Sequence, residues 1–177
     1  MKVLGAIIAG GASSRFGSDK GAALLGGKAL IDHVADGLRS QVDALIICGR
    51  EWPGLTSVAD RPAPGMGPLG GLCAALHYGA KAGYEHVVTA GCDVLPVPAL
   101  GNGTEGAAVI AGHYLFGHWP TALAPMLDAH LSAQTNRSMR HWIAVSGARE
   151  VSCDTAFHNL NTQDDFLLYS REQGLAA

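Results

Sequence analysis

The sequence predicts an α/β domain in which helices cover both faces of a mostly parallel β-sheet. Short apolar runs, each long enough for a buried strand, alternate with longer segments whose apolar residues recur at helical spacing. Strands separated by helices of this length are joined by right-handed crossovers, which produce three layers. The chain has 177 residues, enough for one compact domain but too few for two ordinary ones. We therefore expect residues 1–177 to form a single three-layer domain.

Each expected element follows from a local pattern. The apolar runs expected to be strands are residues 3–9, 43–48, 55–59, 85–90, 107–111 and 150–153. The segments expected to be helices are residues 29–40, 69–81, 123–131, 136–145 and 162–172. The first helix carries Leu30, Ile31 and Val34 at helical spacing, and the last begins at Thr162 with Asp165 three residues later, as in a capping box. Residues 10–27 are expected to form a glycine-rich loop.

Composition and charge exclude several classes of protein. The net charge of −3 provides no surplus of Lys and Arg for neutralising a nucleic acid. No run reaches the roughly 20 apolar residues of a membrane span, and the basic, apolar start is interpreted as a strand rather than a signal peptide. Of the thiols, Cys48, Cys73, Cys92 and Cys153, none forms a C-x-x-C pair. Reduced cysteines and a cytoplasmic location are expected.

The histidines and cysteines show no recognised metal-binding spacing. Eight histidines are present, but no H-x-x-x-H or H-E-x-x-H occurs. His113 and His118, five residues apart, are interpreted like the others as polar surface or loop residues. Three of the cysteines lie in or beside apolar runs and are expected to be small core residues.

Three loops each follow the end of an expected strand: residues 10–20, 60–67 and 92–98. In open α/β sheets, ligands bind outside the carboxyl ends of the strands. These loops should therefore lie on one edge of the sheet. They contain most of the residues that suggest chemistry.

The first of these loops has the composition of an anion site. Gly10 and Gly11 follow the strand directly and allow main-chain amides to approach phosphate oxygens, while Arg15 and Lys20 add positive charge. The spacing is neither that of a Walker A loop nor G-x-G-x-x-G. From composition alone, a surface turn with two solvated cations explains the loop equally well.

Two aspartates follow expected strands. Asp93 comes after the strand at 85–90 and is placed to bind Mg²⁺, which prefers carboxylate, phosphate and water oxygens. An aspartate that merely stabilises a turn or caps a helix would occupy the same place. Asp60 invites the same two interpretations.

Several motifs in order along the chain resemble the MobA-like nucleotidyltransferases, and within them the molybdenum cofactor guanylyltransferases. They comprise Ala9-Gly10-Gly11-x-x-x-Arg15-Phe16-Gly17-x-Asp19-Lys20, Leu25-Gly26-Gly27-Lys28, Asp60, Gly67-Pro68-Leu69-Gly70-Gly71, Cys92-Asp93, Pro120-Thr121-Ala122-Leu123 and Asn159-Leu160-Asn161-Thr162. The resemblance covers nearly the whole chain. It implies the Rossmann-like three-layer fold of the nucleotide-diphospho-sugar transferases.

The same resemblance implies a reaction: transfer of GMP from GTP to the terminal phosphate of molybdopterin, with release of pyrophosphate. It implies that Mg²⁺ is the cofactor, held by Asp93, and that proteins delivering molybdopterin are partners. The residues implied to contact nucleotide are Ile8, Ala9, Gly10, Gly11, Lys20, Asp60 and Asp93. Arg15, Lys20 and Asp93 are the implied catalytic groups, and Pro120, Asn159 and Asn161 the implied border of the acceptor pocket.

Three alternatives stay open at this stage. A cytidylyltransferase acting on the same cofactor, or a nucleotidyltransferase acting on another small phosphorylated acceptor, would share the fold. The family often has Asn after the second strand, where this chain has Cys48-Gly49-Arg50, so the base contact differs. A nucleotide-binding module without catalysis is disfavoured, because Lys20, Asp60 and Asp93 are all retained.

Overall fold

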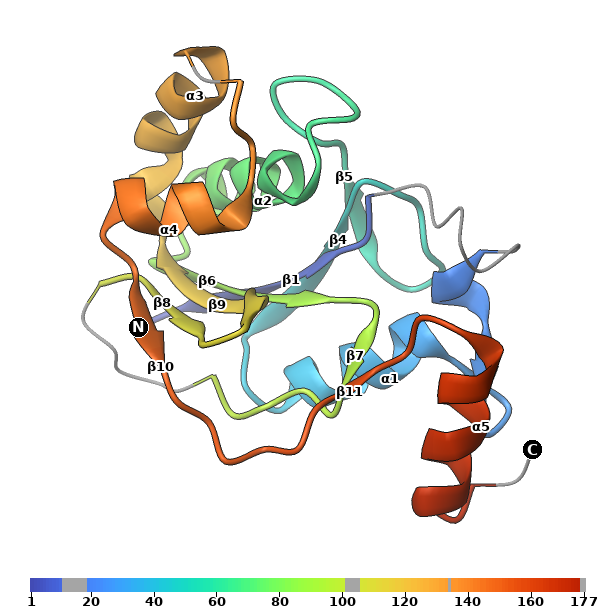
Figure 1. Ribbon diagram of the computed structural model, residues 1–177. Coiled ribbons are helices and arrows are strands. Elements are labelled where there is room, and N and C mark those ends of the chain that lie inside the picture. Colours follow the sequence, from blue (N-terminus) through green and yellow to red (C-terminus); the bar gives the residue numbers. More distant parts are fainter. Residues whose placement is uncertain (11–18, 101–105, 134, 176–177) are drawn as a thin grey trace.

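The computed structural model describes residues 1–10, 19–100, 106–133 and 135–175. Its centre is a sheet of seven strands, shown in Figure 1. In spatial order the strands are β10 (Arg149–Val151), β8 (Ala108–Ile110), β9 (His113–Pro120), β6 (His86–Gly91), β1 (Val3–Ile8), β4 (Ala44–Cys48) and β5 (Thr56–Val58).

The sheet is mostly parallel, as the sequence predicts. β1 lies between β4 and β6 and pairs with both in parallel, and β4 pairs with β5 in parallel. β9 is the exception, since it runs antiparallel to β6 and to β8. The carboxyl ends of β1, β4 and β6 therefore meet at one edge, where Ile8 is level with Cys48 and Gly91.

Helices cover both faces of the sheet (Figure 1). Their bounds are α1 (Leu30–Arg39), α2 (Pro68–Ala82), α3 (Ala124–Ala133), α4 (Met139–Ser146) and α5 (Gln163–Glu172). One core joins α2, α3 and α4 to the sheet around the fully buried Trp119 and Trp142. A second core joins α1 and α5 to the other face. Burial of these two apolar faces is the main stabilising contribution of such a layered fold.

Strand β9 was not predicted, and His118 within it is not a surface residue. The side chain of His118 is only 2 % exposed and stacks on His86 of β6, with ring centroids 4.5 Å apart. Gly117 makes room for Trp119, because a Cβ at Gly117 would lie 2.4 Å from the indole nitrogen. That nitrogen donates to Thr89 Oγ1 at 3.1 Å and so satisfies a buried polar group. The segment gives no strand signal because its aromatic and His residues do not alternate with polar ones.

The expected glycine-rich loop contains more structure than predicted. A short 3₁₀ helix, η1 (Lys20–Ala22), is followed by a hairpin of β2 (Leu24–Leu25) and β3 (Lys28–Ala29). The hairpin turns at Gly26 and Gly27, both with positive φ, as the favoured two-residue turn requires.

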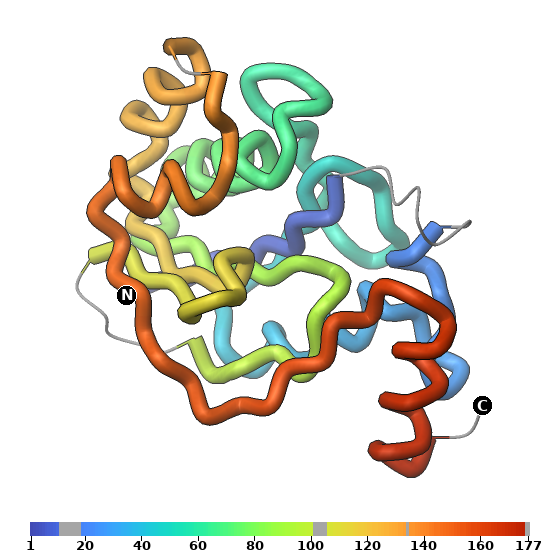
Figure 2. The backbone as a smooth tube through the Cα atoms, in the orientation of Figure 1, coloured from blue at the N-terminus to red at the C-terminus, as the bar shows by residue number. Residues whose placement is uncertain are grey.

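The carboxy-terminal part of the chain returns to the edge where β1 and β6 end. Figure 2 shows the segment after β10 crossing the face of the sheet that carries α1 before it enters α5. On the way, β11 (His158–Asn159) pairs antiparallel with β7 (Val94–Leu95), directly after Asp93. The predicted capping box at the start of α5 is confirmed, with Thr162 and Asp165 each accepting from the other's backbone. In the described ranges, no helix has the length and apolar character needed to cross a bilayer.

Candidate active site

A cavity of about 240 Å³ opens where β1 and β6 end. Its lining includes Ile8, Ala9 and Gly10 from the end of β1, together with Lys20 and Asp93. This is the edge at which ligands bind in open α/β sheets. The structure thus brings together, around one space, the described residues that the sequence singled out for phosphates and metal.

Lys20 and Asp93, which line this cavity, form a polar cluster with Asn161. Lys20 Nζ lies 3.4 Å from Asp93 Oδ2 and donates to Asn161 Oδ1 at 2.5 Å. The Lys20 side chain is only 11 % exposed, whereas that of Asp93 is 39 % exposed, so the carboxylate side chain is the more accessible of the two. The backbone holds the third member in place, since Leu160 N donates to Asp93 O at 2.8 Å. An ammonium and a carboxylate held side by side are suited to a ligand carrying both phosphates and a bound cation.

Asp19 and Arg50 position the helix that carries Lys20. Asp19 caps η1 by accepting from Gly21 N at 3.1 Å. Arg50 donates to both oxygens of Asp19, at 2.7 and 2.5 Å, a bidentate geometry that fixes both side chains. The Arg50 hydrogen bond, together with its charge, lowers the pKa of Asp19, which is therefore ionised at neutral pH.

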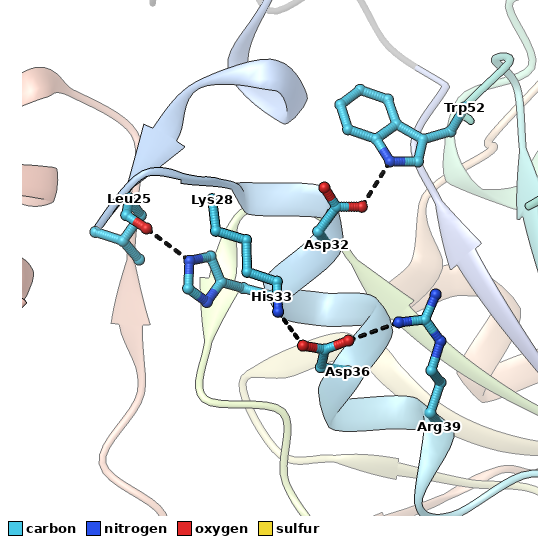
Figure 3. Close-up of polar contacts among 7 residues, drawn as sticks. All are labelled: Leu25, Lys28, Asp32, His33, Asp36, Arg39 and Trp52. Atoms are coloured by element: carbon cyan, nitrogen blue, oxygen red, sulfur yellow. Dashed lines mark hydrogen bonds and ion pairs between the residues drawn. The ribbon is translucent and has the colours of Figure 1, made fainter. Parts of the chain in front are cut away.

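The other side of Arg50 is anchored to α1. Its guanidinium stacks over the ring of Trp52, 5.2 Å from the centroid. Figure 3 shows Trp52 in turn donating from Nε1 to Asp32 of α1, at 2.8 Å. The figure also shows Lys28 and Arg39 on either side of Asp36, a separate set of ion pairs along the same helix. Arg50 thus sits between a fixed partner on η1 and a fixed ring, and it lines the cavity.

Asp60 lies in a second cavity of about 350 Å³, which shares Arg50 with the first. Burial raises the pKa of the Asp60 carboxyl group. Its Oδ1 is buried and makes no hydrogen bond with the described part of the chain. Gly10 and Gly49 separate the two cavities, and their backbones touch: a Cβ at Gly49, whose φ is +84°, would lie 2.5 Å from Gly10 Cα. Only glycine fits at that contact.

The expected acceptor-pocket residues do not all lie together. Asn161 lies in the cavity cluster, and Asn159 lies beside it, paired with Val94 of β7. Pro120 is elsewhere, because β9 is antiparallel and Pro120 pairs with His86 at the opposite end of β6. Pro120 therefore does not line this cavity, and its place at the border of the acceptor pocket stays a prediction. The residue that β9 contributes to the cavity is Leu115.

Gly11 and Arg15 lie outside the residues that the structure describes. Among the described residues, sequence reasoning missed Asp19, Arg50 and Leu115 as parts of the cavity. Asp19 is adjacent to Lys20 in the motif and could have been found by asking what caps the following turn. Arg50 follows the end of β4, the same signal that pointed to Asp60 and Asp93. Leu115 gave no signal, because its strand was not recognised.

The chemistry of the Asp93 region fits a magnesium ion. Mg²⁺ is usually held in such sites by one or two carboxylates, with water and substrate phosphates completing the octahedron. Asp93 supplies a half-exposed carboxylate at the cavity wall, and Asn161 adds an amide oxygen nearby. These are hard oxygen donors with room beside them for a phosphate.

A mostly parallel sheet that holds an ammonium and a carboxylate at its carboxyl edge suits an α/β enzyme that acts on nucleotide phosphates. Residues 5–153 match the model of the MobA-like NTP transferase domain, so the chain belongs to that family. A molybdenum cofactor guanylyltransferase from Cereibacter sphaeroides is 36 % identical over 93 % of this chain and 94 % of its own. Another from Serratia proteamaculans is 33 % identical over 98 % of this chain and 97 % of its own.

A solved structure shares the fold. The molybdopterin-guanine dinucleotide biosynthesis protein A from Archaeoglobus fulgidus superposes with a TM-score of 0.72 at 18 % identity, over 97 % of this chain and 98 % of that one. The predicted fold class is thereby confirmed.

Proposed function

We propose that this chain transfers GMP from GTP to the terminal phosphate of molybdopterin and releases pyrophosphate. The proposal draws on the family membership and on the names of the relatives from Cereibacter and Serratia. The observation that carries it is the Lys20–Asp93 pair at 3.4 Å inside the cavity beyond β1 and β6. Without that pair, the fold alone would support many functions.

The nucleotide phosphates would lie in the first cavity. Ile8, Ala9 and Gly10 line this cavity, and Lys20 supplies the positive charge. The amino terminus of α2 reaches the same cavity through Pro68, so its helix dipole adds a favourable field for anions. Gly11 and Arg15, which follow the same strand in the sequence, complete the proposed set of phosphate contacts.

The guanosine portion would extend past Gly10 and Gly49 toward Asp60. An ionised carboxylate only accepts hydrogen bonds. The buried Oδ1 of Asp60 therefore suits a ligand with donors, such as ribose hydroxyls or the N–H groups of guanine. We assign Asp60 to this role.

The chemistry requires positioning and charge balance rather than a covalent nucleophile. An oxygen of the acceptor phosphate attacks the α-phosphorus of GTP, the new P–O–P bond forms, and the bond to the β-phosphate breaks. Lys20 would offset the negative charge that accumulates on the α-phosphate and on the departing pyrophosphate. A Mg²⁺ ion held by Asp93 would act as a Lewis acid on the phosphate oxygens.

Asn159 and Asn161 are proposed to border the acceptor. They come from the segment that pairs with β7, on the Asp93 side of the cavity, whereas Asp60 lies on the other side. The acceptor phosphate would then approach from the side opposite the guanosine. The whole of residues 1–177 is proposed to act as one domain, since Asn161 contacts Lys20 although it lies beyond the matched residues 5–153. A cytoplasmic location and a protein that delivers molybdopterin belong to the same proposal.

The base preference is tested by comparing GTP, CTP and ATP. With Mg²⁺ present, the rise in Tm should be largest for GTP, because a ligand at about 100 times its Kd adds roughly 2.7 kcal/mol to the free energy of unfolding. Purified molybdopterin and labelled GTP should then give a labelled dinucleotide and pyrophosphate. A larger rise in Tm with CTP would assign the chain to cytidylyl transfer. Nucleotide binding without any transfer would leave only a binding module.

A further inference from the structure

A second group of reactive side chains lies outside the nucleotide cavity, between α2 and α3. Cys73 and His77 are one turn apart on α2, so they project from the same face of the helix. Asp128 of α3 faces them. One ligand atom from each, Sγ, an imidazole nitrogen and a carboxylate oxygen, lies within 4.8 Å of the other two.

The contacts within this group centre on Asp128. Cys73 Sγ donates to Asp128 Oδ1 at 3.1 Å, and His77 Nε2 lies 2.5 Å from Asp128 Oδ2. A tetrahedral zinc site with bonds of about 2.0–2.3 Å separates such ligand atoms by roughly 3.3–3.6 Å. The contacts with Asp128 are shorter than this, so a metal ion would enter as side-chain rotations move the Cys73 and His77 ligand atoms away from the carboxylate.

A nucleophilic triad does not explain the group. In such a triad the histidine lies between the thiol and the acid, whereas here the acid lies between the thiol and the histidine. Burial, and then the contact with Asp128, raises the pKa of the Cys73 thiol to about 12, so the free thiol is not activated. A reactive cysteine needs the opposite environment.

Hydrogen bonding accounts for this group only in part. His77 Nε2 is buried and lies 2.5 Å from Asp128 Oδ2, but the N–H is poorly aligned with that contact. The contact helps to lower the pKa of Asp128, and it leaves the imidazole nitrogen and the carboxylate oxygen close enough to bind one ion. The ring nitrogen points into the group as a ligand would.

We propose that Cys73, His77 and Asp128 form a binding site for a divalent transition metal of the zinc type, with water as a fourth ligand. Sulfur and imidazole ligands favour Zn²⁺ or Co²⁺ over the hard Mg²⁺ of the nucleotide site. On binding, the metal–sulfur bond forms as the Cys73 proton leaves to solvent. The ion would link α2 to α3, and this role does not depend on which nucleotide the protein uses.

Arg61 allows metal binding to be distinguished from a purely structural role of the group. Its guanidinium lies 3.7 Å from Asp128 Oδ2 and so competes with a metal for the same carboxylate. Burial works to raise the pKa of Asp128, but the hydrogen bond from Cys73 and the contacts with His77 and Arg61 together lower it. Arg61→Gln should therefore tighten metal binding, an effect that a purely structural hydrogen-bond network would not produce.

The test is a titration of the untagged, reduced protein with Co²⁺ in the presence of excess Mg²⁺, followed by absorption. Binding at this site gives a thiolate-to-cobalt charge-transfer band with the visible bands of tetrahedral Co²⁺, and one equivalent of Zn²⁺ abolishes both. Asp128→Asn and His77→Gln should each weaken the affinity for Co²⁺ by more than about tenfold. Loss of a residue that only supports a metal ligand already costs about that much. Cys73→Ser should remove the charge-transfer band.

Cys153→Ser is the matched control, because Cys153 is half-buried and contacts Thr155, far from α2. This variant should titrate like the wild type, and Arg61→Gln should bind Co²⁺ more tightly. The proposal is overturned if no charge-transfer band develops, or if the band survives in Cys73→Ser. Circular dichroism of each variant identifies any that fails to fold. If a buried variant does not fold, the Co²⁺ affinity of His77→Gln tests the proposal, because this half-exposed position tolerates substitution best.

Discussion

The two cavities that meet at Arg50 differ in how their charges are balanced. In the first, Lys20 faces Asp93 and Arg50 faces Asp19, so each of these charges has an opposite neighbour within 3.4 Å. In the second, the buried Oδ1 of Asp60 makes no hydrogen bond within the described residues. The first cavity is thus arranged before any ligand arrives, whereas the second carries an electrostatic cost that a ligand with donors relieves.

This contrast indicates that the two cavities serve different steps, the first the reaction and the second the binding of the ligand. Preorganised charges, which need no rearrangement as the reaction proceeds, stabilise a transition state. A buried acceptor without a partner favours binding, because a ligand lacking the matching donor leaves the acceptor unsatisfied. We therefore expect substitutions in the first cavity to lower kcat and those at Asp60 to raise KM.

The largest effect is expected for Asp93→Asn. The amide keeps the shape but loses the charge that would hold Mg²⁺, so kcat should fall by about 100- to 1,000-fold, as on loss of one transition-state electrostatic group. Steady-state assays over a range of Mg²⁺ concentrations measure this loss. Asp36→Asn, on the α1 surface, is the control and should change nothing. Wild-type turnover by Asp93→Asn would remove the metal role from this residue.

Lys20→Ala should come next. It removes the ammonium from a cavity where a charge-assisted hydrogen bond to phosphate is worth about 1.5–3 kcal/mol. We therefore expect kcat to fall, KM for GTP to rise as well, and kcat/KM to fall by roughly 10- to 100-fold. Lys28→Ala is its control, because Lys28 pairs with Asp36 outside both cavities (Figure 3). If both variants behaved alike, Lys20 would have no special part in the reaction.

Arg50→Lys should have a smaller effect, because it keeps the charge that the two cavities share. Lysine cannot make the bidentate contact with Asp19 or stack on Trp52 in the same way. We expect kcat/KM to fall by about threefold to tenfold, equivalent to about 1 kcal/mol, through poorer positioning of η1 and Lys20. Asp19→Asn should lower kcat/KM by a similar factor. The double variant should lose no more than either single variant does. Additive losses would show that the two side chains act independently.

The smallest effect is expected for Asp60→Asn, and it is a gain rather than a loss: the ligand-free variant should be more stable than the wild type. Burial raises the pKa of Asp60, so the folded protein holds that proton more tightly than the unfolded chain. Stability therefore falls as the pH rises from the ordinary value of 3.8 through the raised one, and at pH 7 the full cost is present. The amide removes this cost.

Differential scanning fluorimetry measures the outcome for Asp60→Asn. The ligand-free variant should have a higher Tm than the wild type at pH 7, by about 2–4 °C for each kcal/mol gained. The difference should shrink toward the ordinary carboxyl pKa, and KM for GTP should rise. Asp154→Asn, at an exposed position, should show neither change. A lower Tm for Asp60→Asn would contradict the unpartnered carboxylate described above.

Most of the parallel sheet could be predicted because its strands are apolar runs between clear breaks, as β1 and β6 illustrate. β9 could not, since it mixes His, Gly and aromatic residues, and its fit depends on the Trp119–Thr89 contact across strands. The order of strands is a tertiary property. It places Pro120 beside His86, at the end of β6 away from the cavity.

The candidate site divides in a similar way. Lys20 and Asp93 could be expected near each other, because both follow strands whose ends share one edge. The partnership of Lys20 with Asn161, 141 residues later, depends on how the last segment pairs with β7. Cys73 and His77 stand four residues apart in one expected helix, but their pairing was not predicted, and Asp128 belongs to another helix that no local pattern links to them.

The pairing of β11 with β7 makes the site dependent on the final part of the chain. All seven strands of the main sheet are in place by Val151, whereas the amide that holds Lys20 comes from position 161. During translation, a ribosome-bound chain could complete its sheet and still lack a finished catalytic centre. Proteolytic clipping after β10 would separate Asn161 from Lys20 and α5 from the second core.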